Sequence, residues 1–102
     1  MIDIKTWLEA AGEPVTEVCF PPGDVPSLPY IVFIDHVQYR GADSKNMIAE
    51  HSLMIERYSE TCGDNSMLES LFADIPYSKE KQWVSNVDQF LCVYNMEFIE
   101  KF

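Results

Sequence analysis

The sequence predicts an α+β domain in which a mainly antiparallel sheet of about four to five strands carries two helices on one face. Strand-like segments follow one another along the chain instead of alternating regularly with helices, which favours antiparallel pairing over βαβ units. Two further stretches show the apolar spacing of helices, one ending at a glycine and one at a proline. The expected order is helix, strand, strand, strand, helix, strand, strand, in a single domain over residues 1–102.

Length and charge narrow the class of protein. A chain of 102 residues with 47% hydrophobic side chains is long and apolar enough for one core. Its 17 acidic and 7 basic side chains give a formal charge of -10, which repels phosphate and anionic lipid. The first residues lack a cationic leader followed by an apolar segment, and no apolar run approaches the roughly 20 residues that span a bilayer. We expect a cytoplasmic protein that binds neither nucleic acid nor membrane.

The first helix is expected to begin after Asp3, whose side chain is a good N-cap, and to end at Gly12. Between them one apolar face recurs at helical spacing: Ile4, Trp7, Leu8 and Ala11. Residues 16–20 have the composition of a short edge strand. Residues 21–29 are rich in proline, which removes backbone donors, so this segment is not a central strand.

Two strands are predicted next. Residues 30–34 are apolar on both alternating faces, which indicates a strand inside the sheet and covered on both sides. Residues 48–59 alternate, with Ala49, Leu53 and Ile55 on one face and Glu50, Ser52 and Glu56 on the other. The segment between these strands is read as a loop of about ten residues, longer than an ordinary hairpin turn.

The second helix is marked by the capping-box pattern Ser66-Met67-Leu68-Glu69 and ends before Pro76. Its apolar stripe consists of Met67, Leu68, Leu71, Phe72 and Ile75. A strand over residues 81–85, a turn at 86–88 and a long strand over 89–99 complete the domain. The last strand places Phe90, Cys92, Tyr94, Met96 and Phe98 on one face at period two.

No catalytic, cofactor-binding or metal-binding residue is predicted. The chain lacks the GxSxG, HExxH and Gly-rich phosphate-loop patterns. His51, on a strand between two polar residues, is interpreted as a surface or interface residue and not as a general base. The acidic pairs Asp35 with Asp43, and Glu97 with Glu100, are interpreted as solvated surface.

The three cysteines are expected to be free structural thiols. Their odd number and wide spacing fit neither a disulfide framework nor a zinc site, because no CxxC pair is present. Cys19 and Cys92 fall in apolar, strand-like runs. Cys62 precedes a glycine in a predicted turn, so it is the thiol expected to react with a reagent.

The segment 37–46 is the candidate contact region, because it concentrates charged and aromatic side chains in a chain that is poor in basic residues. The residues concerned are Tyr39, Arg40, Asp43 and Lys45. Tyrosine and arginine are the side chains most enriched at binding hot spots. An arm that touches a neighbouring subunit is the preferred interpretation, and an ordinary solvated loop with Gly41 as its turn residue is the alternative.

Three short patterns occur in a fixed order: Pro29-Tyr30-Ile31-Val32-Phe33-Ile34-Asp35, then Gly41-Ala42-Asp43, then Ile55-Glu56-Arg57-Tyr58. This order resembles the tail-completion, or tail-terminator, proteins of long-tailed bacteriophages and prophages. The resemblance implies a non-enzymatic assembly protein without cofactors, made in the host cytoplasm and incorporated into the virion tail. It implies a ring, usually hexameric, that sits on the last ring of tail-tube protein, stops tube growth and presents a surface to the head connector.

In such a ring DNA passes through the centre without specific binding, and carboxylates lining the conduit would repel it. Glu50 and Glu56, on the polar face of the strand over 48–59, are the expected channel-facing residues. An acidic phage-encoded inhibitor, or DNA mimic, that binds a basic host protein is the alternative function. A small enzyme ranks third, because its active site would have to be assembled from residues without a recognisable motif.

Overall fold

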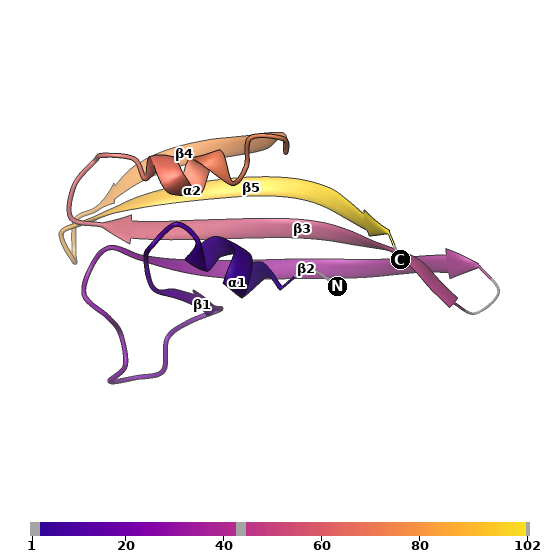
Figure 1. The fold of residues 1–102 in the computed structure, drawn as a ribbon. Coiled ribbons are helices and arrows are strands. Elements are labelled where there is room, and N and C mark those ends of the chain that lie inside the picture. The colour runs from indigo at the N-terminus through magenta and orange to yellow at the C-terminus, as the bar shows by residue number, and fades with distance from the viewer. Residues whose placement is uncertain (1–2, 43–44, 102) are drawn as a thin grey trace.

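The computed structural model describes residues 3–42 and 45–101, with side chains throughout except at residues 42 and 45–47. Two short helices and five strands follow the predicted order: α1 (Ile4–Glu9), β1 (Val15–Glu17), β2 (Tyr30–Ala42), β3 (Lys45–Ser59), α2 (Ser66–Ser70), β4 (Tyr77–Val84) and β5 (Gln89–Lys101). The strands form one sheet in the order β1-β2-β3-β5-β4 (Figure 1). The predicted α+β class is confirmed.

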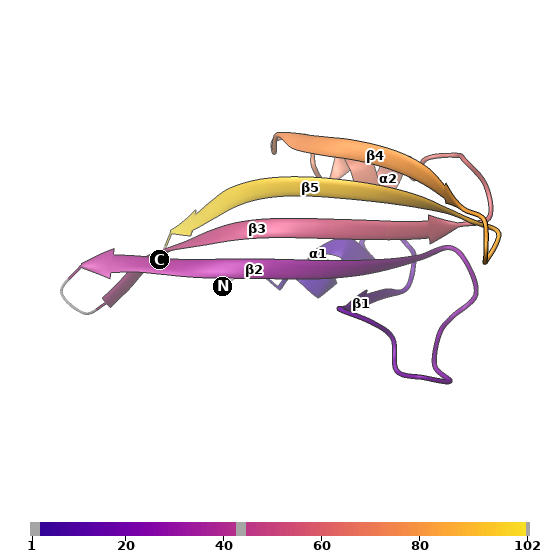
Figure 2. The ribbon, with the colours of Figure 1, turned by 180° about the vertical axis from the view of Figure 1, so that it is seen from behind.

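Both helices lie on the same side of the sheet, so that the view from behind shows the strands in front of them (Figure 2). The core lies between the helices and the sheet, and its largest fully buried side chains include Leu8, Phe72, Leu53, Ile55 and Tyr94. Among the described residues no helix covers the opposite side of the sheet, and we call that side the open face. Because the helices cover one side, the sheet has one apolar face, which packs against them, and one solvated face.

Each helix begins directly after a residue whose side chain caps its first turn. Asp3 accepts a hydrogen bond from the Thr6 backbone N–H at 3.2 Å, as predicted, and Gly12 adopts the left-handed φ of 84° that lets the chain leave α1. The predicted cap at Ser66 is wrong. Asn65 caps α2 instead, because its Oδ1 accepts from the Leu68 N–H at 3.0 Å.

The regular turns of α2 end at Ser70, earlier than the apolar stripe suggested. Beyond that residue the backbone continues in turns, with the Phe72 N–H bonded to the Glu69 carbonyl and the Ile75 N–H to the Phe72 carbonyl. With these tighter i to i+3 bonds, Leu68 and Phe72 are fully buried and Leu71 and Ile75 pack against the core, whereas Met67, the first residue of the predicted stripe, is 58% exposed.

The predicted edge strand exists as β1, but it begins at Val15 and ends at Glu17 instead of spanning residues 16–20. It pairs parallel to β2 at Ile31, Val32 and Phe33, which makes the sheet mixed. Pairing stops where Val18 takes a φ of 68°, a conformation that β-branched residues rarely adopt. Cys19, which was placed in a strand-like run, is consequently exposed in the following loop.

The loop predicted over residues 37–46 is wrong, because β2 and β3 continue through it as one long hairpin. Their register runs from Tyr30 opposite Tyr58 to Ala42 opposite Lys45, with an irregularity between Arg40 and Gly41. Successive side chains continue to alternate between the two faces of the sheet beyond Ile34, and the backbone of this part of β2 pairs with β3. Its charged side chains made it look like a loop, although charges are compatible with a strand whose face is solvated.

The prediction that β2 is covered on both sides holds only at its start. Val32 is buried on the open face, but Ile34 on the same face keeps 40% of its surface exposed. The faces of β3 and β5 were predicted correctly: Ala49, Leu53 and Ile55 are buried, while Ser52 on the opposite face is exposed. On β5, Cys92, Tyr94 and Met96 are buried, and Phe98 packs against the core.

The strand predicted over residues 81–85 starts earlier, at Tyr77, directly after Pro76. Tyr77 packs edge-on against Phe72, with ring centroids 5.4 Å apart, which holds the start of β4 against the turns that follow α2. The turn predicted at 86–88 is present, with Asp88 at a φ of 51°. Trp83 and Phe90 form a cross-strand aromatic pair at 4.7 Å beside it.

Candidate assembly surfaces

The β2–β3 hairpin is the first candidate surface. It accounts for much of the 51 Å length of the molecule and extends past the helices (Figure 1). Tyr39 and Arg40, two of the four predicted interface residues, lie on β2 near its end and are exposed. Asp43 lies outside the described residues, and Lys45 is described only as the first backbone position of β3.

Arg40 and Glu50, which were assigned to different surfaces, are brought together. Arg40 Nε lies 3.0 Å from Glu50 Oε1, and the Arg40 side chain keeps 61% of its surface exposed. Both residues project from the open face, Arg40 from β2 and Glu50 from β3. An exposed pair of this kind contributes little to folding, so the Arg40 guanidinium keeps donors available for another acceptor.

Glu56, the second predicted channel-facing residue, also projects from the open face. It accepts a hydrogen bond from the Tyr58 hydroxyl at 3.1 Å. Burial, together with the adjacent Glu56 carboxylate, raises the pKa of Tyr58 to about 12. The Tyr58 ring stacks on Tyr30 at 5.2 Å, so this end of the open face is a small aromatic cluster.

The register places Glu80 of β4 and Glu97 of β5 on the open face as well. Exposed apolar side chains lie among these carboxylates, with 59% of Ile99 and 40% of Ile34 accessible. A surface that mixes carboxylates with exposed aliphatic residues can be a contact surface for another protein.

The two borders of the sheet are the next candidate surfaces. β4 is the last strand in the sheet order, and seven of its eight residues are exposed. At the other border β1 pairs only with Ile31, Val32 and Phe33 of β2. Within the described chain, residues 34–42 of β2 therefore have a strand partner on the β3 side alone.

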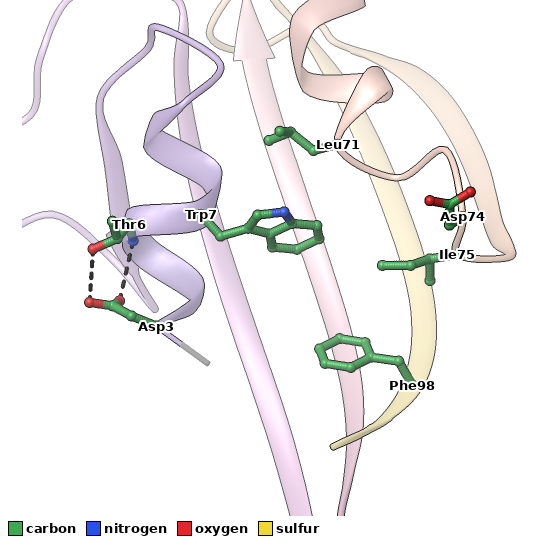
Figure 3. A pocket seen from close by; sticks show the side chains of 7 residues that line it. All are labelled: Asp3, Thr6, Trp7, Leu71, Asp74, Ile75 and Phe98. Atoms are coloured by element: carbon green, nitrogen blue, oxygen red, sulfur yellow. Dashed lines mark hydrogen bonds between the residues drawn. The ribbon is translucent and has the colours of Figure 1, made fainter. Parts of the chain in front are cut away.

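A groove of about 620 Å³ lies on the helix side of the sheet (Figure 3). Trp7 extends into it from α1, Leu71 and Ile75 face it from the segment that follows α2, and Phe98 forms part of its floor on β5. Asp3 and Asp74 stand at its borders. The apolar patterns of the sequence placed Trp7, Ile75 and Phe98 in the core. No pattern in the sequence indicated that α1 and α2 are separated by a groove.

His51 is buried on the helix-covered face, contrary to the prediction of a surface or interface residue. Its Nδ1 lies 2.8 Å from Asp35 Oδ2, and its ring stacks on Phe98 at 4.5 Å. Nε2 faces Glu100 Oε1 at 3.8 Å. Only 3% of the His51 side chain is accessible, so the ring lies inside the packed side of the sheet.

Two ionic networks fix the helix side. Arg57 donates to both oxygens of Glu13, from Nε to Oε1 at 2.9 Å and from Nη2 to Oε2 at 2.8 Å. The hydrogen bonds from Arg57 to Glu13 also raise the pKa of the arginine. Arg57 Nη1 donates to the Gly63 carbonyl at 3.2 Å, so one guanidinium ties the loop after α1 to the loop before α2.

The second network connects α2 with the sheet. Glu69 Oε2 accepts from Lys79 Nζ and from the Tyr94 hydroxyl, both at 2.6 Å. Burial opposes ionisation of Glu69, but the bonds from Lys79 and Tyr94 outweigh it and lower the pKa of this carboxyl. Burial raises the pKa of Tyr94, so the phenol stays protonated and donates.

Within residues 3–42 and 45–101, no group of three or more His, Cys, Asp or Glu side chains is placed to hold a metal ion. The helices in this part of the chain are too short and too polar for one of them to cross a bilayer. Cys19 and Cys62 are exposed and Cys92 is buried, all as free thiols. Cys62 is accessible as expected, but it is not distinguished from Cys19, which is exposed as well.

Comparison with models of protein families finds no match for this chain, and comparison with curated protein sequences finds none either.

Proposed function

We propose that this chain is a virion assembly protein that caps the tail tube of a long-tailed phage or prophage. As a ring of identical subunits, it ends tube polymerisation and offers a docking surface to the head connector. The observation that carries the proposal is a sheet with helices on one side only, whose other face and two borders are available for protein contacts. The sequence resemblance to tail terminators supplies the identity of the partners.

Ring formation is supported by the asymmetry of the molecule. A ring requires a heterologous contact, in which two different surfaces of one subunit meet on its neighbours. The chain offers such a pair in β4 at one border and the outer part of β2 at the other. A channel role for Glu50 and Glu56 is supported by their place on the open face, together with Glu80 and Glu97.

The alternative of an acidic DNA mimic is disfavoured by the ion pairs. A mimic needs rows of free carboxylates to imitate phosphates. Here Glu13 is held by Arg57, Glu69 by Lys79 and Glu50 by Arg40. Asp64 lies in contact with Lys79 and Lys81, so these four of the 17 acidic side chains are held in ion pairs and are not free to imitate phosphates.

The proposal is tested by growing tail tubes from purified tube protein with and without this chain and measuring tube length by electron microscopy. We expect short tubes with one extra ring of density at one end. Tubes of unchanged length with bare ends, at a molar excess of the chain, would contradict a capping function. In that case a salt-sensitive complex with a basic host protein would favour the inhibitor.

A further inference from the structure

The two borders of the sheet, β4 and the part of β2 beyond Phe33, differ in sequence. This difference determines which edges of two copies of the chain can pair. An edge strand presents a row of backbone N–H and C=O groups that can pair with another strand. β4 presents such a row along its eight residues, and β2 presents one beyond Phe33, where pairing with β1 ends. One subunit thus has two edges of different sequence at opposite borders.

We propose that β4 of one subunit pairs with residues 36–40 of β2 in the next subunit, as an antiparallel ladder that closes the ring. This inference rests on the proposed function and names its subunit contact. β2, β3, β5 and β4 are antiparallel to their neighbours in turn, so β4 runs opposite to β2. A rotation about an axis roughly along the strands therefore brings β4 antiparallel to β2 of the next copy.

The side chains favour one register, in which Arg40 lies opposite Glu80. Both residues project from the open face, and Glu80 is exposed on β4. Because opposite positions of two antiparallel strands share a face, this register keeps the helices of both copies on one side. Arg40 contacts Glu50 through Nε, and 61% of its side chain is exposed, so its guanidinium has further donors for a second carboxylate.

The neighbouring pairs of this register are also compatible. Gln38 comes to lie opposite Gln82 on the open face, where two amides can hydrogen-bond. Val37 comes opposite Trp83 on the other face, and 49% of the Trp83 surface is exposed in the single chain. An aromatic and β-branched pair on opposite positions of two strands stabilises a sheet.

Pairing of identical edges is disfavoured by charge. Two β4 strands centred on Glu80 would place that carboxylate opposite its own copy and Lys79 opposite Lys81. A shift of two residues would place Lys79 or Lys81 opposite itself. Two β2 edges centred on Arg40 would place this residue opposite its own copy. Like charges directly opposite each other destabilise a strand pair, so the mixed contact is preferred.

Cross-linking tests the contact directly. In a chain with Cys19→Ser and Cys62→Ser, the variants Gln38→Cys and Gln82→Cys are prepared separately, mixed and treated with a short bismaleimide, with and without tail tubes. We expect a heterodimer linked through positions 38 and 82, identified by mass spectrometry. Ser52→Cys, exposed on the open face of the central strand β3, is the matched control and should give no product with Gln82→Cys.

Two outcomes would overturn the inference: no 38–82 product in either condition, or dimers formed by each single variant alone, which would indicate pairing of identical edges.

Charge exchange gives an independent readout. Arg40→Glu and Glu80→Arg should each weaken association about tenfold, and a mixture of the two variants should restore it, because each contact regains an ion pair. Failure of the mixture to recover would also contradict the ladder.

The same samples separate this inference from the proposed function. If the 38–82 product forms but tubes grow to normal length, the contact stands and the capping function fails. If the chain caps tubes as a ring but yields no 38–82 product, capping stands and the β4–β2 contact is wrong.

Discussion

On the face of the sheet that carries the helices, Leu53, Ile55 and Tyr94 are almost completely buried, whereas on the open face Ile99 keeps 59% of its surface accessible. The charged side chains on the two faces also differ in how far they are buried and paired. Arg57 on the covered face is held by both oxygens of Glu13, while Arg40 on the open face has one exposed contact with Glu50. The covered face provides the stability of the fold, and the open face and the sheet borders are available for assembly.

The sharpest test of this division compares two aliphatic truncations on opposite faces. Leu53→Ala removes a buried side chain and leaves a cavity, which should lower the free energy of unfolding by about 3–4 kcal/mol. Ile99→Ala should change it by less than about 0.5 kcal/mol, because the side chain is already exposed. Urea denaturation measures both, and equal losses would show that the two faces are not distinct.

The next largest effect is expected for the ionic contacts. Arg57→Ala leaves Glu13 buried without its partner and should cost about 3 kcal/mol. Arg40→Ala should cost less than about 1 kcal/mol, since its pair with Glu50 is solvated. Thermal unfolding of the two variants provides the comparison. The double variant Arg57→Met with Glu13→Leu should recover part of the loss, because no unpaired charge stays buried.

Charge reversal on the hairpin should separate assembly from folding. We expect Arg40→Glu and Asp43→Lys each to weaken self-association or tail joining about tenfold while the melting temperature changes little. Asp43 lies outside the described residues, so its prediction rests on the sequence alone. Infectious yield and solution mass are the measurements. Normal values for both variants would remove these residues from the interface.

A smaller effect should accompany acidification. The pKa of Glu69 is lower in the fold than its ordinary value, although burial opposes this, because Lys79 and Tyr94 donate to the carboxylate. Its stabilising contribution is therefore present above about pH 4.5 and is lost as the pH falls through the lowered pKa of the folded state. In unfolding experiments between pH 6 and 3, Glu69→Gln should show a shallower decline than the parent. A decline of equal slope would mean that other carboxylates dominate.

The sequence predicted the covered face well, because burial imposes a strict pattern. Period two on β5 and the helical spacing around Leu8 identified side chains that the structure buries. The Asp3 cap and the stop at Gly12 were predicted for the same reason, since local backbone chemistry determines them.

The contact regions were predicted less well because their signals are not local. The charged residues of this segment resembled a loop, and the backbone pairing of β2 with β3 shows that Tyr39 and Arg40 belong to a sheet. His51 looked like a surface residue, and its burial depends on Asp35, which is sixteen residues away. The free borders follow from the strand order, which depends on long-range pairing.

Self-assembly at a tube end is the step on which the proposed function depends, and solution mass tests it most directly. Light scattering over a concentration series, with and without purified tail tubes, distinguishes a monomer from a closed ring. We predict either a ring in solution or a monomer that joins the end of the tube and blocks its growth. A chain that stays monomeric at every concentration and does not bind tubes would contradict the account.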